Sequence, residues 1–216
     1  MIYDCDDADQ RAEGIRQATY AVRRGDLVVL PTDTVYGIGA DAFTPAAVAA
    51  LLAAKGRGRD MPVPVLVGSR QVLDALVESL PDYARALIDV LWPGALTVVA
   101  RHTPALAWDL GDSHGTVAVR MPADRIALDL LKDTGPMAVS SANRSGLPPA
   151  TTCANAQAQL GDSVAVYLDG GPTTTSVPST IVDVTGDAPA LLRRGWITEE
   201  RLREIIPDVE LRSPAT

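Results

Sequence analysis

The stretch that decides the fold is Leu27-Val28-Val29-Leu30-Pro31-Thr32-Asp33-Thr34-Val35-Tyr36-Gly37-Ile38-Gly39. Its four leading apolar residues predict a strand buried on both faces, and Pro31 ends this strand because proline cannot donate to a sheet ladder. Hydroxyl and carboxylate groups, a tyrosine and two glycines follow. In an α/β sheet, polar groups at the carboxyl end of a strand are typical of a binding site, although an ordinary turn uses the same residues.

The composition limits the class of protein. The chain has 216 residues and a formal net charge of −8, so it is long enough for one sizeable domain. The negative charge argues against a broad nucleic-acid-binding face, which needs basic residues. Cys5 and Cys153 are too few for a disulfide framework or a metal cluster, and we expect reduced thiols. Since neither a signal peptide nor a membrane-spanning run is found, we expect a cytoplasmic protein with no membrane partner.

Helix and strand signals alternate along the rest of the chain. A helix capped by Asp7 or Asp9 runs to Arg24, and further helices are predicted at 45–54, 70–77, 81–91, 124–132, 152–160 and 198–206. Strands are predicted at 27–30, 63–67, 95–100, 116–120, 136–140, 164–168, 180–184 and 190–193. Pro62 and Pro64 favour an irregular or edge position for 63–67. We expect one α/β domain over 1–216 with a mixed sheet, a core at about 10–206 and a frayed tail at 207–216.

A basic cluster follows the second predicted helix. Lys55-Gly56-Arg57-Gly58-Arg59 brings three cations together, separated by glycines that let the backbone approach a ligand closely. Arginine binds phosphate oxygens in pairs, and lysine adds a point charge. The same residues also suit a solvated helix end, where the macrodipole favours cations. In a chain this acidic, we favour the anion-binding interpretation.

Other predicted strands also end in polar groups. Arg120 ends an apolar strand, which points either to a structural carboxylate partner or to an anionic ligand. The segments Ser140-Ser141-Ala142-Asn143 and Pro178-Ser179-Thr180, and the pair Arg193-Arg194, lie at further strand ends and by themselves suit ordinary turns. Because five such groups occur in one chain, we expect them to share one polar pocket.

Taken together, these segments resemble the YrdC family of threonylcarbamoyl-AMP synthases. The resemblance covers about Ile15 to Ile206, and it is carried by residues 31–37, 55–57, 92–97, 119–122, 140–143 and 178–183, in the order of the family. It implies a twisted mixed α/β sheet, flanked by helices, with a large concave pocket. It also implies the short bacterial form, without the extra C-terminal domain of longer relatives.

The resemblance implies a nucleotidyltransferase. L-threonine, bicarbonate or CO₂, and ATP would become threonylcarbamoyl-adenylate and pyrophosphate. The product would be handed to the tRNA threonylcarbamoyl transferase complex, which modifies tRNA. Mg²⁺ would enter with ATP, and no protein-held metal is expected. Direct tRNA binding would be weak or absent.

The same resemblance implies site residues. Contacts to L-threonine are expected at Thr34, Arg120 and Ser179. Contacts to ATP are expected at Lys55, Arg57, Thr116, Ser141, Asn143, Thr151 and Arg193, and the first two would supply the catalytic charge neutralisation. Arg59 is added as an ATP contact from the local charge cluster alone.

One departure and two rivals stand beside this prediction. Some relatives have Asn and His where this chain has Met61 and Leu66, so neither contact is transferred. A non-catalytic binder of structured RNA, using the same pocket, is the alternative function, although it would need a basic stripe. A transferase that uses carbamoyl phosphate as its carbon source is a second alternative.

Overall fold

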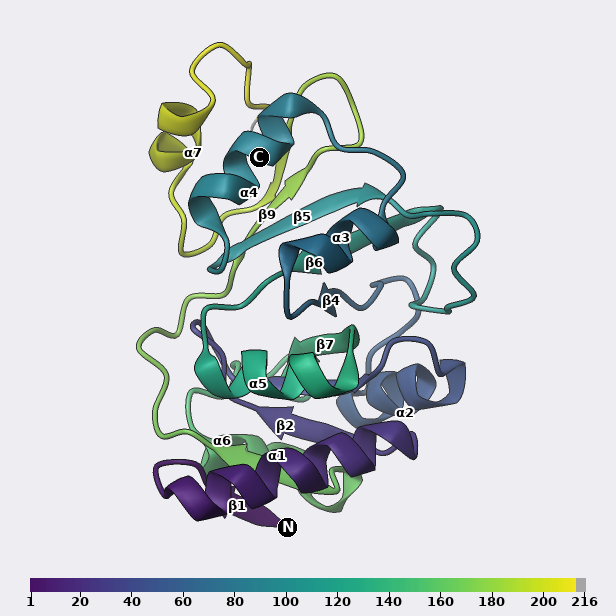
Figure 1. The fold of residues 1–216 in the computed structure, drawn as a ribbon, viewed down its shortest axis with the longest axis vertical. Helices are drawn as coiled ribbons and strands as arrows, with labels where there is room; N and C mark the ends of the chain where they lie inside the picture. Colours follow the sequence, from purple (N-terminus) through teal and green to yellow (C-terminus); the bar gives the residue numbers. More distant parts are fainter. Residues whose placement is uncertain (213–216) are drawn as a thin grey trace.

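The computed structural model describes residues 1–212, and ten strands form one mixed sheet in the order β1-β8-β2-β3-β7-β4-β6-β5-β9-β10 (Figure 1). The strands are β1 (Ile2–Asp4), β2 (Val28–Leu30), β3 (Gly37–Asp41), β4 (Val65–Leu66), β5 (Leu96–Arg101), β6 (Thr116–Arg120), β7 (Met137–Ser141), β8 (Val166–Asp169), β9 (Thr180–Asp183) and β10 (Ala190–Arg193). The helices are α1 (Ala8–Arg23), α2 (Pro45–Lys55), α3 (Arg70–Leu76), α4 (Asp82–Leu91), α5 (Arg125–Thr134), α6 (Cys153–Leu160), followed by the 3₁₀ turn η1 (Gly161–Ser163), and α7 (Glu199–Ile205). The predicted α/β class with a mixed sheet is confirmed.

Strand β3 is an element that the sequence prediction missed. The polar segment after β2 turns back, and β3 pairs antiparallel with β2 and with β7. Gly37 and Gly39 weaken a strand by propensity, but a Cβ on either would come within 2.7 Å of Val139 or Met137. The glycines therefore allow close packing against β7, and the polar residues 31–36 form the loop between two paired strands.

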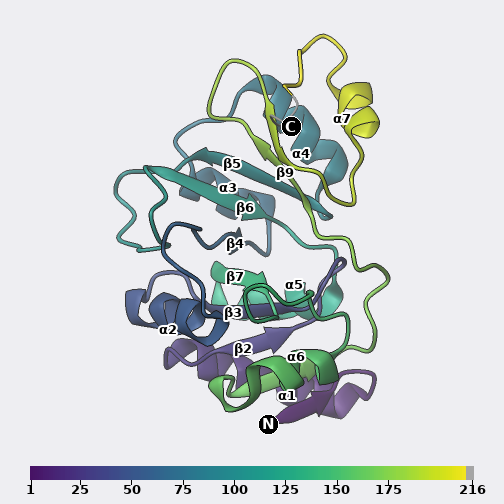
Figure 2. The ribbon, with the colours of Figure 1, turned by 180° about the vertical axis from the view of Figure 1, so that it is seen from behind.

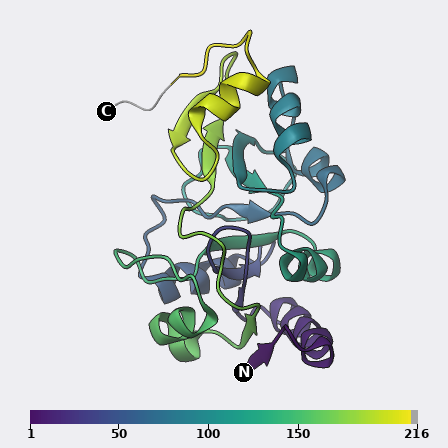
Figure 3. The same cartoon turned by 90° about the vertical axis from the view of Figure 1, so that its left-hand side faces the viewer.

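Two helix pairs cover the two faces of the lower half of the sheet. Helices α1 and α5 pack side by side on one face, where Val28 and Leu30 of β2 are buried (Figures 1 and 3). Helices α2 and α6 cover the opposite face, against Val29 and Ile38 (Figure 2). Successive residues of β2 thus point to opposite buried layers, which is why this strand reads as a continuous apolar run.

Strand β4 joins the two halves of the sheet. It is short, as its flanking prolines suggest, but it lies inside the sheet between β7 and β6, so an edge position is wrong. The backbone continues the pairing on both sides, because Val139 N donates to Pro64 O (2.8 Å) and Val67 N donates to Arg120 O (3.0 Å). Prolines at 62 and 64 are tolerated there since a carbonyl still accepts where the proline nitrogen cannot donate.

Both ends of the predicted core need correction. Residues 2–4 form β1, which pairs parallel with β8, so regular structure begins before residue 10. In the predicted frayed tail, Leu211 is buried and Arg212 bridges to Ala190, so the tail is anchored at these two residues, whereas 213–216 lie outside the described residues. Within residues 1–212, no helix combines the length and the apolar character needed to cross a membrane.

Helix ends follow the local sequence signals. Of the two candidate caps for α1, Asp7 is the one that accepts a hydrogen bond, from Gln10 N at 2.8 Å. Helix α2 ends at Gly56, whose positive φ of 61° is left-handed. The left-handed residue ends the helix and turns the backbone after Lys55, so that Arg57 lies toward the middle of the sheet.

Candidate active site

Most of the predicted site residues meet in one cavity of about 450 Å³. Its walls come from the β2–β3 loop, the segment after α2, and strands β4, β5, β6, β7, β9 and β10. The predicted site residues that line it are Thr34, Arg57, Thr116, Arg120, Ser141, Ser179 and Arg193. Lys55, Arg59, Asn143 and Thr151 do not line it. The cavity therefore brings together strand ends that lie far apart in the sequence.

Arg120 forms the most completely bonded wall of the cavity. Its Nε donates to Gly94 O (2.9 Å), Nη1 donates to Thr34 Oγ1 (2.9 Å), and Nη2 donates to Asp33 Oδ1 (2.6 Å). The guanidinium is buried, which lowers its pKa, while the Asp33 carboxylate opposes that shift. The structural carboxylate partner considered for Arg120 is thus present, and it is Asp33.

A second wall of the cavity is built around Ser179 and Arg193. Arg193 donates from Nε and Nη2 to Ser179 O (3.0 and 2.7 Å), and from Nη2 to Ser179 Oγ (3.0 Å). The hydroxyl of Thr97 lies 2.8 Å from the same Oγ. Burial lowers the pKa of Arg193, and the positive charges of Arg120 and Arg57 lower it further. This wall has a cation but no carboxylate.

Arg57 is the second cation without a carboxylate partner. Its Nη1 donates to Ser140 Oγ (3.1 Å) and its Nη2 donates to Pro62 O (3.3 Å), whereas its buried Nε has no hydrogen-bond partner. Burial lowers the pKa of Arg57, and the nearby charge of Asp60 opposes this shift without forming an ion pair. Among the described residues, neither Arg57 nor Arg193 forms an ion pair. An anion in the cavity would supply the missing charge to both.

Lys55 lies behind the cavity wall rather than on it. Its side chain is buried, and Nζ donates to Ser141 O, to Asn143 O (2.7 Å) and to Asn143 Oδ1 (3.5 Å). Burial, with the nearby positive charge of Arg57, lowers the pKa of Lys55 to about 8. The ammonium therefore ties the end of α2 to the segment after β7, and a phosphate contact by Lys55 stays a prediction.

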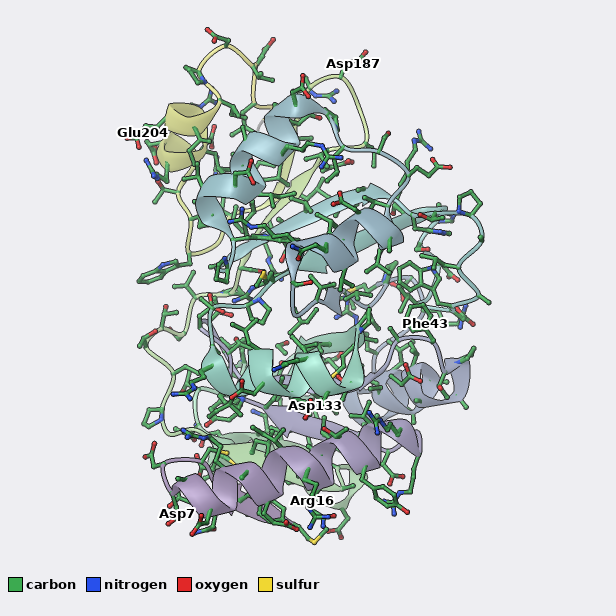
Figure 4. The ribbon with its side chains drawn as sticks, in the orientation of Figure 1. Asp7, Arg16, Phe43, Asp133, Asp187 and Glu204 are labelled. Carbon is green, nitrogen blue, oxygen red and sulfur yellow. The ribbon has the colours of Figure 1, made fainter. Side chains whose placement is uncertain are left out.

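Arg59 points away from the cavity, so the basic cluster divides. Its guanidinium is bidentate to Asp109 (3.1 and 2.7 Å) and reaches Asp112 at 3.5 Å, all in exposed positions. These bonds hold the β5–β6 loop against the segment after α2. Trp108 of that loop also stacks on Phe43, with ring centroids 5.7 Å apart. Phe43 is labelled in Figure 4. The ATP contact predicted for Arg59 has no support in this geometry.

Asn143 and Thr151 support the cavity from outside it. Asn143 Nδ2 donates to Arg144 O (3.0 Å) and Leu147 O (2.7 Å), which orders the turn after β7. Thr151 O accepts from Thr173 N at 2.8 Å, which ties this turn to the β8–β9 connection. Their predicted ATP contacts also stay predictions.

Sequence reasoning missed polar residues that the cavity uses. Thr32, Thr97 and Ser140 line it, and Asp33 holds Arg120. One sequence signal could have revealed such a residue: a hydroxyl inside an otherwise apolar predicted strand, as at Thr97. Asp33 lay in the stretch that decides the fold, but its partner is 87 residues away and only the fold brings the two together.

The two positions that depart from the family pattern differ in placement. Leu66 is buried and lines the cavity, whereas Met61 is 47% exposed and does not line it. The cavity thus has an apolar side chain at position 66, next to Arg120 in the β4–β6 register.

Cysteine nucleophiles are not available in this site. Cys5 and Cys153 are free and buried, and neither lines the cavity. Burial is the main cause that raises the pKa of Cys5 to about 11 and that of Cys153 to about 12. Both stay protonated thiols at neutral pH.

A second hollow, of about 470 Å³, lies beside α1 and has no comparable chemistry. Its arginines are already engaged, because Arg16 pairs with Glu13 and Arg23 donates to Asp133 O (3.0 Å). Arg16 and Asp133 are labelled on this outer face in Figure 4.

Comparison with known proteins identifies the family. The family model for Sua5, YciO and YrdC, described as "Telomere recombination", matches residues 20–195. A Mycobacterium tuberculosis protein, provisionally named a threonylcarbamoyl-AMP synthase, is 58% identical over 204 residues, covering 94% of each chain. The threonylcarbamoyl-AMP synthase of Bacillus subtilis is 38% identical over 199 residues, covering 91% of this chain and 58% of that protein.

A solved structure agrees over the whole fold. Sua5 of Pyrococcus abyssi, in its complex with L-threonine, superimposes with a TM-score of 0.92 and 35% identity. The match covers 98% of this chain and 62% of the Sua5 chain. The chain therefore belongs to the Sua5/YciO/YrdC family.

Proposed function

We propose that this chain is an L-threonylcarbamoyladenylate synthase, which converts L-threonine, bicarbonate or CO₂, and ATP to threonylcarbamoyl-AMP and pyrophosphate. The observation that carries the proposal is a single cavity lined by two arginines without an ion pair, Arg57 and Arg193, together with Arg120, whose charge Asp33 matches. Relatives named threonylcarbamoyl-AMP synthase, and the threonine complex of Sua5, support the same activity.

Arg120 has donors left for the amino acid. A guanidinium has five N–H groups, and three of them are engaged by Gly94, Thr34 and Asp33. One N–H therefore remains on each terminal nitrogen, which suits a two-point contact with a carboxylate. Asp33 and Gly94 keep the guanidinium oriented before the substrate arrives, so little ordering is needed on binding.

Arg57 and Arg193 suit the phosphates of ATP. Each carries N–H groups that no protein acceptor uses, and each is a positive charge on the cavity lining without an ion pair among the described residues. Mg²⁺ would enter with ATP as part of the substrate. Within the described residues, no group of three His, Cys, Asp or Glu is placed to hold a metal ion.

The chemistry requires orientation and charge neutralisation more than a protein nucleophile. The amine of threonine adds to CO₂ and releases a proton to solvent, which gives a carbamate. A carbamate oxygen then attacks the α-phosphorus, and the bond to the bridging oxygen breaks, so pyrophosphate leaves with the electron pair. Arg57 and Arg193 would stabilise the charge of the leaving pyrophosphate.

The product is a mixed anhydride and would be passed to the tRNA threonylcarbamoyl transferase complex in the cytoplasm. The net charge of −8 disfavours the alternative of a structured-RNA binder. We expect direct tRNA binding to be weak or absent.

The test is pyrophosphate release from ATP and Mg²⁺ with bicarbonate, with and without L-threonine. We expect release that depends on both threonine and bicarbonate, with serine much less effective. If release requires carbamoyl phosphate in CO₂-free buffer, the carbon source is carbamoyl phosphate rather than bicarbonate. No release, together with tight and salt-sensitive tRNA binding, would favour the RNA-binding alternative.

A further inference from the structure

A buried hydroxyl on the cavity floor has no role in the activity described so far. Thr97 is 3% exposed and lies in β5 between Leu96 and Val98, which are both core residues. Its Oγ1 has one hydrogen-bond partner among the described residues, Ser179 Oγ at 2.8 Å. Because a polar group buried in an apolar strand is costly unless it is bonded, this contact accounts for threonine rather than valine at position 97.

The hydrogen bonds around Ser179 limit what its hydroxyl can do. A serine hydroxyl has one proton to donate and two acceptor sites. Arg193 Nη2 donates to one acceptor site (3.0 Å), and Thr97 Oγ1 lies within hydrogen-bond distance of the same oxygen. If Thr97 donates, both acceptor sites are filled and the Ser179 proton has no partner among the described side chains. That proton then needs an acceptor from the cavity.

We propose that Thr97 is a positioning residue that donates to Ser179 Oγ and leaves Ser179 only as a donor to an oxygen of the bound amino acid. The inference rests on the proposed function. It adds a constraint on how the substrate is oriented. Ser179 offers no acceptor to the substrate's ammonium or amine, but it can donate to a carboxylate or hydroxyl oxygen of the substrate. The amine therefore stays free to take up CO₂.

The opposite arrangement gives a different expectation. If Ser179 donates to Thr97, its proton is already used, and the acceptor site left open on Ser179 would face the substrate's ammonium rather than an oxygen. Removing the Thr97 hydroxyl would then free the Ser179 proton for a substrate oxygen, so KM for threonine would not rise. The two arrangements therefore predict different changes in the Michaelis constant (KM) for threonine when the Thr97 hydroxyl is removed.

The experiment compares Thr97→Val, Thr97→Ser, Ser179→Ala and the double variant Thr97→Val/Ser179→Ala in threonine-dependent pyrophosphate release. Thr97→Val keeps the shape of the side chain, and we expect it to raise KM for threonine about tenfold without changing KM for ATP. Thr97→Ser restores the donor and should return KM to within about twofold of the wild type. In the Ser179→Ala background, Thr97→Val should add nothing, because it acts through Ser179.

Thr134→Val is the matched control. It removes a hydroxyl that donates to Leu130 O (3.0 Å) at the end of α5, outside the cavity, and KM for threonine should not change. The inference is overturned if Thr97→Val leaves KM for threonine unchanged, if Thr97→Ser is equally impaired, or if the two substitutions are additive. A wild-type protein without threonine-dependent release would instead defeat the proposed function, and the inference with it.

Discussion

The two walls of the cavity both present an arginine paired with a hydroxyl, but they differ in charge. On one wall Arg120 bonds Thr34 and is matched by Asp33 at 2.6 Å. On the other, Arg193 bonds Ser179 and has no carboxylate within the described chain. The first wall is neutral before a substrate arrives, so it contributes fixed geometry. The second keeps its charge for an anion.

This difference separates stability from binding. Removing one member of a buried ion pair leaves an uncompensated charge, which is strongly destabilising, whereas removing an unmatched cation relieves repulsion. The charge of Arg57 lowers the pKa of Lys55, and the charges of Arg120 and Arg57 lower the pKa of Arg193, which is the sign of such repulsion. The walls should therefore respond in opposite ways to substitution.

The largest effect is expected at the matched wall. Asp33→Ala leaves Arg120 buried with its charge unpaired, and we expect the free energy of unfolding to fall by about 3 kcal/mol. Urea denaturation checks this value. The double variant Asp33→Ala/Arg120→Met should recover part of the loss, since it removes the stranded charge. A stability equal to the wild type in the single variant would contradict the neutral-wall interpretation.

The unmatched wall should lose binding without losing stability. Arg57→Ala removes a cation with no ion pair, and we expect kcat/KM for ATP to fall about 100-fold while the urea midpoint stays within error. Pyrophosphate release at varied ATP concentration measures this effect. Arg59→Ala is the matched control two residues along, because Arg59 is exposed and bound to Asp109. It should change kcat/KM for ATP less than about twofold, and a loss as large as that of Arg57→Ala would restore Arg59 to the site.

The smallest expected effect, which can be measured most directly, is the lowered pKa of Lys55. The chain has two lysines, Lys55 and Lys132, so ¹³C-lysine NMR gives two signals, which Lys132→Arg assigns. We expect the Lys55 signal to titrate at about pH 8 in the free protein, below its ordinary value of 10.5. If ATP phosphate approaches Nζ, the midpoint should rise on adding Mg²⁺ and ATP, because an anion favours the charged form.

The same shift predicts a pH dependence of stability. Between pH 8 and 10.5 the unfolded chain keeps a proton on Lys55 that the folded protein has lost. The free energy of unfolding should therefore rise through that window, relative to Lys55→Met, as the cost of burying the charge disappears. An unshifted Lys55 signal in the free protein, or a stability difference that falls with pH, would contradict the burial of a charged Lys55.

Much of the architecture followed from the sequence because local signals repeat across it. The run 27–30, the strand at 116–120 and the helix capped at Asp7 all appear where periodicity and capping indicated. Strand β3 did not, because Gly37 and Gly39 have low strand propensity and are selected by contact with Val139 and Met137. The interior position of β4 was also missed, since two prolines normally mark an edge.

For the site, the sequence by itself determined which chemical groups are available: hydroxyls and arginines at strand ends, beside an acidic composition. Residue type and position relative to apolar runs are local properties, and they suffice to single out the segments that contain Thr34, Arg57, Arg120, Ser179 and Arg193, whereas the family resemblance selected the individual residues. Only the tertiary structure decided which cations are already matched. Asp33 and Arg120, or Thr97 and Ser179, are more than 80 residues apart, and hydrogen bonding and burial depend on distances that the fold alone sets.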